Sequence, residues 1–167
     1  MQSLLKSRKF EVVRRSVNDD RSVDVIVHPG AVVVLPLLSD DEIIMLRNYR
    51  PAVERELWEL PAGTLDVAGE SPRDAALREL EEEAGHRAGQ LDLLCAFYPS
   101  PGVMTELIRA YVATDLTRTT QQLEPGEQIV VETMKAATAL AMVRDGRIMD
   151  AKTIITLMWW EMGRRES

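Results

Sequence analysis

Residues Trp58 to His86 read WELPAGTLDVAGESPRDAALRELEEEAGH. Ser71 can accept a hydrogen bond as the N-cap of a helix, and Pro72 suits the first helical turn. Gly85 is a natural helix stop. The stretch therefore predicts a helix of about four turns, which follows a loop containing glycine and proline and carries many carboxylates.

The faces of this helix follow from a rotation of about 100° per residue. The apolar stripe is formed by Ala76, Leu77, Leu80 and Ala84. Glu79 and Glu83 stand on one flank of the stripe, about 40° apart, with Glu82 about 60° further round from Glu79. Arg78 precedes Glu82 by one turn and can pair with it. Glu81 falls on the opposite flank, where we expect it to be solvated.

The three glutamates on one flank are costly without a counter-ion. Two like charges 5–6 Å apart repel by about 3 kcal/mol at an effective dielectric constant of 20. An acidic run alone is usually a solvated helix face, but here it follows a glycine loop at Gly63 and an Arg78-Glu79 pair. Oxygen ligands with no histidine or cysteine among them favour Mg²⁺, with Mn²⁺ as a substitute. The pattern therefore predicts a divalent-metal site that holds a pyrophosphate.

Composition narrows the class of protein. With 167 residues, 46% of them hydrophobic, the chain can bury one core and is most simply a single domain over residues 1–167. The net charge of −7 argues against a nucleic-acid surface, which needs a basic patch. Cys95, the one cysteine, cannot form an internal disulfide and is expected in the core. No stretch is apolar enough for a membrane or a leader peptide, so we expect a cytoplasmic protein with no membrane partner.

Patterns outside the central stretch predict the remaining elements. Apolar or alternating runs predict strands at 31–38, 42–49, 54–60, 91–98, 106–114 and 128–134. Helical periodicity predicts two terminal helices at 133–144 and 150–162. Polar alternating runs at 9–17 and 21–27 predict an N-terminal hairpin within residues 1–29, whose apolar side chains need a partner. The order predicts an α/β sandwich with a catalytic core over residues 30–167, rather than a regular parallel series.

The central stretch resembles the Nudix box, G-x5-E-x7-R-E-U-x-E-E-x-G-U, where U is an apolar residue. The fixed positions are filled by Gly63, Glu70, Arg78, Glu79, Leu80, Glu82, Glu83 and Gly85. Six residues, TLDVAG, stand between Gly63 and Glu70 instead of five, and His86 occupies the final apolar place. The extra residue lies in the loop before the helix. It therefore leaves the position of Glu70 open, but not the positions of the three metal-binding glutamates. This resemblance implies the Nudix-type α/β/α sandwich with a mixed sheet.

The resemblance also implies roles for the residues of the box. The implied metal ligands are Glu79, Glu82, Glu83 and the carbonyl of Ala62. Arg78 would orient a glutamate, and Glu70 would tie the loop to the helix. The implied reaction is hydrolysis of a nucleoside diphosphate linked to a group X, by attack of water on a metal-bound P–O–P link.

Three further segments resemble the ADP-ribose pyrophosphatase branch of that family. They are Glu59-Leu60-Pro61-Ala62-Gly63, Ser100-Pro101-Gly102 with Glu106 after it, and the Asp145–Thr153 segment. The resemblance covers about residues 30 to 165 and implies Mg²⁺-dependent cleavage of ADP-ribose to AMP and ribose 5-phosphate. Arg47 and Arg50 are candidate clamps for the diphosphate, because guanidinium groups match phosphate oxygens. Glu59 is a candidate acceptor for ribose hydroxyls.

A general base and a second subunit are also implied by the resemblance. The polar loop from Thr117 to Gln128 contains Glu127, our first candidate for the base, and Glu124, the second. Members of the branch are typically homodimers with exchanged N-terminal strands. In that arrangement residues near Phe10 or Arg21 would contact the ligand of the neighbouring subunit.

Two alternatives to ADP-ribose hydrolysis stay open. The chain could hydrolyse another nucleotide sugar such as GDP-mannose, since the sequence shows no clear residue that reads the base. It could also be an ADP-ribose sensor that binds without cutting, although such a module is expected to lose metal-binding glutamates.

Overall fold

A computed structural model describes residues 2–166, with side chains described up to residue 164. The elements in chain order are β1 (Gln2–Lys6), β2 (Glu11–Asn18), β3 (Arg21–Val27), β4 (Ala31–Pro36), β5 (Glu42–Arg50), β6 (Arg55–Glu59), β7 (Ala62–Thr64), α1 (Pro72–Ala84), β8 (His86–Phe97), β9 (Ile108–Arg118), β10 (Ile129–Lys135), α2 (Ala136–Arg144) and α3 (Ala151–Glu166). None of the helices within residues 2–166 has the length and apolar character needed to span a bilayer.

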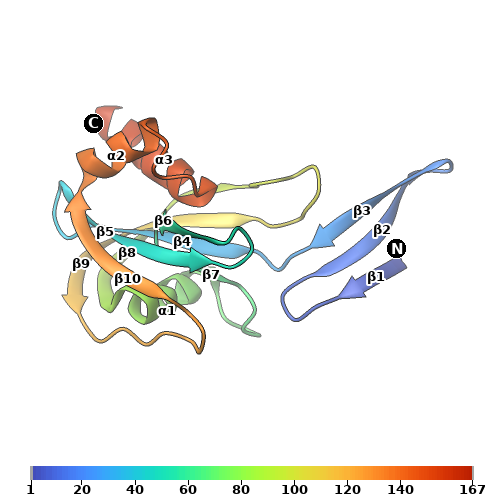
Figure 1. The fold of residues 1–167 in the computed structure, drawn as a ribbon, viewed down its shortest axis with the longest axis horizontal. Helices are drawn as coiled ribbons and strands as arrows, with labels where there is room; N and C mark the ends of the chain where they lie inside the picture. Colours follow the sequence, from blue (N-terminus) through green and yellow to red (C-terminus); the bar gives the residue numbers. More distant parts are fainter. Residues whose placement is uncertain (1, 167) are drawn as a thin grey trace.

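The core contains two sheets between helical layers (Figure 1). The first has the strand order β7-β4-β9-β8, in which β4 and β9 are parallel and the other pairs are antiparallel. The second, β10-β5-β6, is antiparallel throughout. Helix α1 covers one side, and α2 and α3 cover the other. The predicted α/β/α sandwich with a mixed sheet is confirmed.

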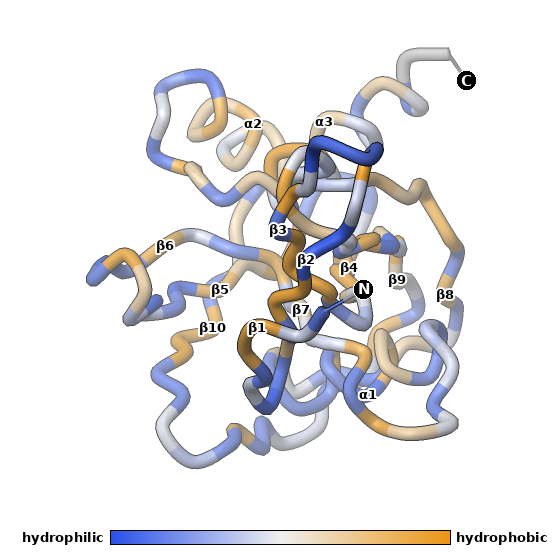
Figure 2. Tube along the Cα trace, turned by 90° about the vertical axis from the view of Figure 1, so that its right-hand side faces the viewer, coloured by the Kyte–Doolittle hydropathy of each residue, from blue (hydrophilic) through white to orange (hydrophobic). Residues whose placement is uncertain are grey.

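Strand β4 shows why the central strands are apolar on both faces. Val32 and Val34 pack in the cluster that contains the apolar stripe of α1, whereas Val33 and Leu35 pack in the cluster under α2 and α3. Successive side chains of a strand point to opposite faces, so a strand between two helical layers needs an unbroken apolar run. Figure 2 shows hydrophobic residues along the central strands and hydrophilic residues in the outer loops.

The predicted N-terminal hairpin is present as β2 and β3, but it belongs to a three-stranded sheet. Strand β1, which the sequence did not indicate, pairs antiparallel with β2. The sheet projects from the core as an arm (Figure 1). Its base is joined to the core by two backbone hydrogen bonds of 2.9 Å, from Ile26 to Val103 and from Thr105 to Ile26.

Several boundaries differ from the predicted ones. Strand β8 begins at His86, separated from the end of α1 by one residue, rather than at residue 91. Strand β10 continues to Lys135, which delays the start of α2 to Ala136. The short strand β7 was not predicted and pairs with β4 through Ala62 to Thr64.

Helix α1 begins and ends where its capping residues predict. The Ser71 hydroxyl accepts a hydrogen bond of 3.1 Å from the Asp74 N–H. Gly85 adopts a left-handed conformation, φ 63°, and its N–H donates to the Glu81 carbonyl. Ala76 and Leu80 are fully buried against the sheet. This packing fixes the rotation of the helix, so the three glutamates lie beside the apolar stripe, with Glu83 buried.

Candidate functional site

A cavity of about 400 Å³ opens between α1, the β7 strand, the β9–β10 loop and the start of α3. It is lined by Lys9, Ala31, Arg50, Ala62, Gly63, Thr64, Asp66, Val67, Arg78, Glu79, Glu82, Glu83, Pro99, Glu106, Ile108, Gln122, Glu124, Glu127, Asp150, Ala151 and Lys152. Most of the residues that the sequence singled out are therefore brought together here. The exceptions are Glu70, Arg47, Glu59 and Pro101, which lie near or outside the lining.

The three glutamates on the flank of α1 all line the cavity. Arg78 Nη1 donates to Glu79 Oε1 and to Glu82 Oε2, each at 2.8 Å. Glu83 is only 5% exposed, and its Oε2 accepts a hydrogen bond of 2.8 Å from the Ala62 N–H. Glu81 is absent from the lining, as its position on the opposite flank predicts, but it is half-buried and pairs with Arg87 at 2.8 Å rather than being solvated.

Glu70 is held at the base of the helix despite the extra residue in the loop before it. Its two carboxylate oxygens accept from Arg78 Nε at 2.9 Å and from Arg78 Nη2 at 3.1 Å. Arg78 therefore joins Glu70, Glu79 and Glu82 through one guanidinium. The loop absorbs the insertion, and the tie between loop and helix is kept.

Gly63 is required by a close approach between β7 and α1. A Cβ atom built at this position would lie 1.9 Å from Glu79 Oε1 and 2.1 Å from its Cδ. Real atoms cannot come so near, so any side chain at position 63 would displace the Glu79 carboxylate. The glycine thus leaves room for that carboxylate beside the loop.

Burial perturbs the two inner carboxylates. Desolvation is the main cause that raises the pKa of Glu83 to about 8, and the nearby charges of Glu79 and Glu127 act in the same direction. Burial also raises the pKa of Glu79, against the opposing charge of Arg78. A cation among these groups would favour their ionised forms.

The donor set fits a hard divalent cation. The lining offers carboxylate oxygens from Glu79, Glu82 and Glu83, the type of ligand that Mg²⁺ and Mn²⁺ prefer. Within residues 2–166, no three acidic, histidine or cysteine side chains already converge as a ready cluster of ligands. Glu79 and Glu82 meet at one nitrogen of Arg78, whereas the Ala62 N–H holds the Glu83 carboxylate. These side chains would have to turn toward an ion to bind it together.

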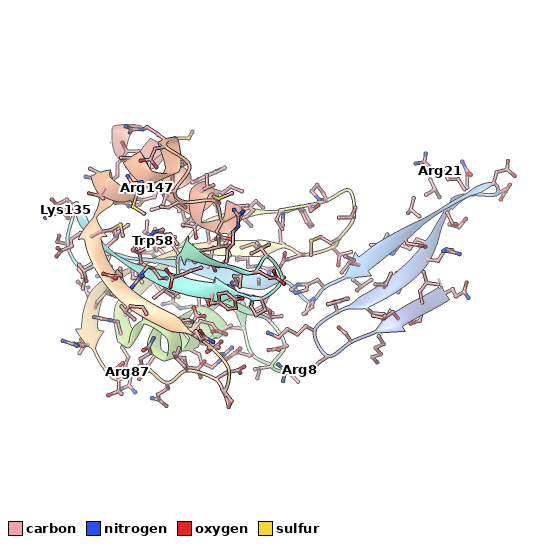
Figure 3. The ribbon with its side chains drawn as sticks, viewed as in Figure 1. Arg8, Arg21, Trp58, Arg87, Lys135 and Arg147 are labelled. Carbon is pink, nitrogen blue, oxygen red and sulfur yellow. The ribbon has the colours of Figure 1, made fainter. Side chains whose placement is uncertain are left out.

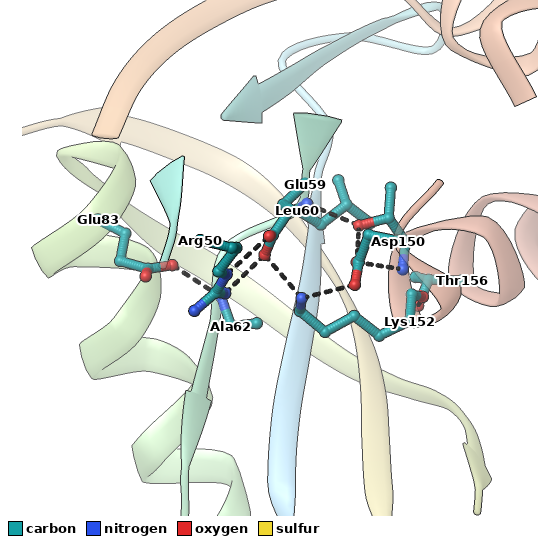
Figure 4. A network of polar contacts seen from close by, with 9 residues as sticks. Arg50, Glu59, Leu60, Ala62, Glu83, Asp150, Lys152 and Thr156 are labelled. Carbon is teal, nitrogen blue, oxygen red and sulfur yellow. Dashed lines mark hydrogen bonds and ion pairs between the residues drawn. The ribbon is translucent and has the colours of Figure 1, made fainter. Parts of the chain in front are cut away.

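Arg50 and Lys152 supply positive charge at another side of the cavity. Arg50 Nε and Nη2 donate to the two oxygens of Glu59 at 2.7 and 2.6 Å. Lys152 Nζ donates to Glu59 Oε2 at 2.7 Å and to Asp150 Oδ1 at 3.0 Å (Figure 4). Glu59 itself is 1% exposed and does not line the cavity, so its oxygens face these cations rather than a ribose.

Arg47 lies outside the cavity. Its guanidinium lies 3.1 Å from Glu56 and 3.3 Å from Glu132, and it stands 5.9 Å from the ring centroid of Trp58, which Figure 3 labels. Arg47 and Arg50 are three positions apart on β5, and residues an odd number apart on a strand point to opposite faces. The sequence contained this signal, and it excludes a two-arginine clamp built from the same strand face.

Pro101 itself does not line the cavity. Pro101 is exposed in a turn, and Pro99 is the proline that lines the cavity. Glu106 does line it, and its carboxylate lies 3.5 Å from His28 Nδ1 at the base of the N-terminal arm.

The two candidate bases lie in the β9–β10 loop. Glu124 and Glu127 are exposed and line the cavity, and Glu127 Oε2 accepts a hydrogen bond of 2.8 Å from the Glu124 N–H. The charge of Glu127, after the effect of burial, contributes to the raised pKa of both Glu79 and Glu83. Of the two, Glu127 is therefore the one whose charge reaches the inner carboxylates.

Sequence reasoning missed several lining residues. Lys9 belongs to the β1–β2 turn, and the tertiary fold brings this turn to the cavity. No local sequence pattern predicts that position. Lys152 lies in the Asp145–Thr153 segment that the sequence had indicated without giving it a role. Arg21 is far from the cavity of its own chain, at the tip of the arm (Figure 3).

Comparison with known proteins agrees with this geometry. The NUDIX domain family matches residues 27–154. An ADP-ribose pyrophosphatase of Bacillus subtilis is 38% identical over 83% of this chain and 76% of its own length. A GDP-mannose pyrophosphatase of Citrobacter koseri is 31% identical over 77% of this chain and 71% of its own.

A solved structure described as an ADP compounds hydrolase has the same fold. It superposes with a TM-score of 0.81 over 99% of this chain and 91% of that chain, at 23% identity. The shared fold, the matched domain and the carboxylates of the box on α1 lead to one conclusion: this chain belongs to the NUDIX domain family, and it is a Nudix hydrolase.

Proposed function

We propose that the protein hydrolyses ADP-ribose to AMP and ribose 5-phosphate, with Mg²⁺ held at the glutamates of α1. The similarity to an ADP-ribose pyrophosphatase over most of both chains supports this substrate. Water attacks one phosphorus of the diphosphate, and the P–O–P link breaks.

The charge of the cavity is the observation that carries the proposal. Among the described residues, eight acidic side chains line it against four basic ones. A diphosphate would be repelled from such a surface unless cations came with it. When bound, a divalent ion neutralises charge on the phosphate oxygens and polarises the phosphorus. The proposed ligands are Glu79, Glu82, Glu83 and the carbonyl of Ala62.

The chain's own residues then have separate tasks. Arg78 orients Glu79 and Glu82, and Glu70 holds Arg78 in place. Arg50 binds the diphosphate with the guanidinium nitrogen that Glu59 does not occupy. Glu127 takes a proton from the attacking water, with Glu124 as the second candidate. Glu106, which lines the cavity, contacts the substrate.

A substrate panel tests the proposed reaction. Purified protein is assayed with ADP-ribose, GDP-mannose, dinucleoside polyphosphates and NADH, with Mg²⁺ and Mn²⁺ compared. We expect ADP-ribose to have the highest kcat/KM and EDTA to abolish turnover. A clear preference for GDP-mannose would favour the alternative that the Citrobacter koseri relative supports. Binding of ADP-ribose without any product would indicate a sensor.

The glutamates of α1 provide an internal comparison. Glu82→Gln and Glu83→Gln should each lower kcat by about 100-fold or more, because each removes a metal ligand. Glu81→Gln, on the same helix but outside the cavity, should retain wild-type kcat. Full activity of Glu83→Gln would contradict the metal assignment.

We further propose a homodimer built through the N-terminal arm, in a cytoplasmic protein. Support for the dimer comes from apolar side chains that the arm exposes: Leu4, Leu5, Phe10 and Val17. The arm projects from the core (Figure 1), and its exposed apolar side chains can pack against a second copy. Support for a reducing compartment is the single buried cysteine, Cys95.

A further inference from the structure

A buried carboxylate is shared by two cations of the cavity. Glu59 ends β6 behind the lining and is 1% exposed. Arg50 on β5 donates hydrogen bonds to both carboxylate oxygens of Glu59, at 2.7 and 2.6 Å. Lys152 on α3 donates to Glu59 Oε2 at 2.7 Å. Both cations line the cavity, whereas the carboxylate between them does not. The shared anion therefore sets how far apart the two cations stand.

The Lys152 side of this network is anchored at the start of α3. Asp150 accepts from Lys152 Nζ at 3.0 Å and, through its other oxygen, from Thr153 Oγ1 at 2.6 Å. Thr153 is fully buried, and its hydroxyl accepts the Leu60 N–H at 2.9 Å. This hydrogen bond holds the end of β6 against the first turn of α3. Leu60 directly follows Glu59 in the chain and Thr153 directly follows Lys152, so the bond lies beside the Glu59–Lys152 ion pair. Figure 4 shows these contacts side by side.

The network keeps Glu59 ionised. Burial by itself would raise the pKa of Glu59, but the hydrogen bonds from Arg50 and the charge of Lys152 outweigh it and hold the pKa below its ordinary value. Each cation also retains hydrogen-bonding capacity. Within the described residues, Arg50 Nη1 has no hydrogen-bond acceptor, and Lys152 Nζ uses two of its three donors.

We propose that Glu59 is a positioning residue that holds Arg50 and Lys152 as a pair, and that Lys152 is a second cationic contact for the diphosphate of the substrate. This inference rests on the proposed function, because it requires an anionic substrate in the cavity. Arg50 binds phosphate oxygens through Nη1, and Lys152 through its third N–H. Glu59 never touches the substrate; it fixes the spacing at which the two cations meet it.

The test compares Glu59→Gln, Lys152→Met, their combination and Lys152→Arg with the wild type. Steady-state kinetics with ADP-ribose and Mg²⁺ separate KM from kcat, and calorimetry on the same proteins carrying Glu127→Gln, which slows turnover, gives the Kd for ADP-ribose. Glu59→Gln and Lys152→Met should each raise KM and Kd by about tenfold and change kcat by less than about threefold, because they weaken substrate binding rather than the chemical step. Lys152→Arg keeps the charge and should restore most of the affinity.

The double variant decides whether Glu59 acts through Lys152. Residues in one network give non-additive effects, so the combined change should raise KM by about 20-fold rather than the roughly 100-fold of independent effects. The matched control is Glu56→Gln, on the same strand and paired with Arg47 outside the cavity; its KM should stay within about twofold of wild type. The rise in Tm on adding Mg²⁺ should persist in every variant, because the metal ligands on α1 are untouched.

The outcomes separate the substrate contact of Lys152, the positioning role of Glu59 and the proposed hydrolysis. Wild-type KM and Kd in Lys152→Met would overturn the substrate contact, and effects that multiply in the double variant would overturn positioning by Glu59. If Glu59→Gln does not fold, Lys152→Met against Lys152→Arg still decides whether the charge at 152 is required. A wild type that cleaves no substrate in the panel would overturn the proposed function, while the calorimetric comparison would still decide the role of Lys152.

Discussion

Glu83 couples the stability of the protein to pH when no metal is bound. Its ordinary pKa of 4.5 is raised to about 8, mainly by burial. The unfolded chain loses this proton near pH 4.5, whereas the folded protein keeps it until about pH 8. The free energy of unfolding therefore falls as pH rises through this window and levels above it.

Glu83→Gln should remove this fall in the free energy of unfolding, because the amide stays neutral at every pH and can still accept from the Ala62 N–H. In EDTA at pH 8, we expect the variant to have a free energy of unfolding about 2–4 kcal/mol above wild type, and near pH 4.5 the difference should vanish. Urea unfolding at several pH values measures this, with Glu81→Gln as the control. A variant less stable than wild type at pH 8 would contradict the assignment.

Gly63 leaves no room for a side chain beside Glu79. Gly63→Ala adds a methyl group where Glu79 Oε1 lies 1.9 Å away, so the carboxylate must move. We expect kcat to fall by about 100-fold and the Mg²⁺-induced rise in Tm to shrink. Gly102→Ala, where an added Cβ has nothing within 4 Å, is the control and should behave as wild type.

Single residues also show what the sequence could reveal of the site. The glutamates of α1 were predictable because their positions follow from helical geometry within one segment. Arg50 and Arg47 were predicted as partners, yet only Arg50 reaches the cavity. Lys9 and Lys152 could not be placed, because tertiary packing alone brings the β1–β2 turn and the start of α3 to the same space.

Among the elements, α1 depends on its cap. Ser71→Ala removes the hydroxyl that accepts the Asp74 N–H, and loss of such a cap costs about 1 kcal/mol. We expect the free energy of unfolding to fall by about that amount, with kcat unchanged because Ser71 does not line the cavity. Ser71→Asp, which can also cap, should restore the stability. A large fall in kcat for Ser71→Ala would show that the cap does more than support the helix.

The sequence predicts some of the strands more clearly than others. Strands β4 and β5 were predicted because they are covered on both faces and read as unbroken apolar runs. Strand β8 is an edge strand, and its polar start, from His86 to Gln90, carries no such pattern. Strand β7 has three residues and exists because β4 lies beside it. Short and edge strands are determined by their neighbours, which a local pattern does not contain.

The N-terminal arm forms the subunit interface of the homodimer that we propose. Leu5 is 53% exposed on β1, and a charge there would be buried in an interface through the arm. Leu5→Asp should convert a dimer into a monomer in sedimentation-velocity experiments. Leu93 lies on the edge strand β8 and is about as exposed as Leu5, so Leu93→Asp is the control and should leave the dimer intact. A wild-type protein that sediments as a monomer would contradict the dimer.

The loop that holds the extra residue of the box has a practical consequence. Its ends are fixed, by the bond from the Leu65 N–H to the Gly30 carbonyl and by the Glu70–Arg78 pair, while the residues between them are exposed. Ala68 is therefore a suitable place for an engineered cysteine that carries a fluorophore. Cys95 is buried and burial raises the pKa of its thiol, so the dye would label position 68 selectively. Such a reporter would follow ligand entry in real time from the rim of the cavity.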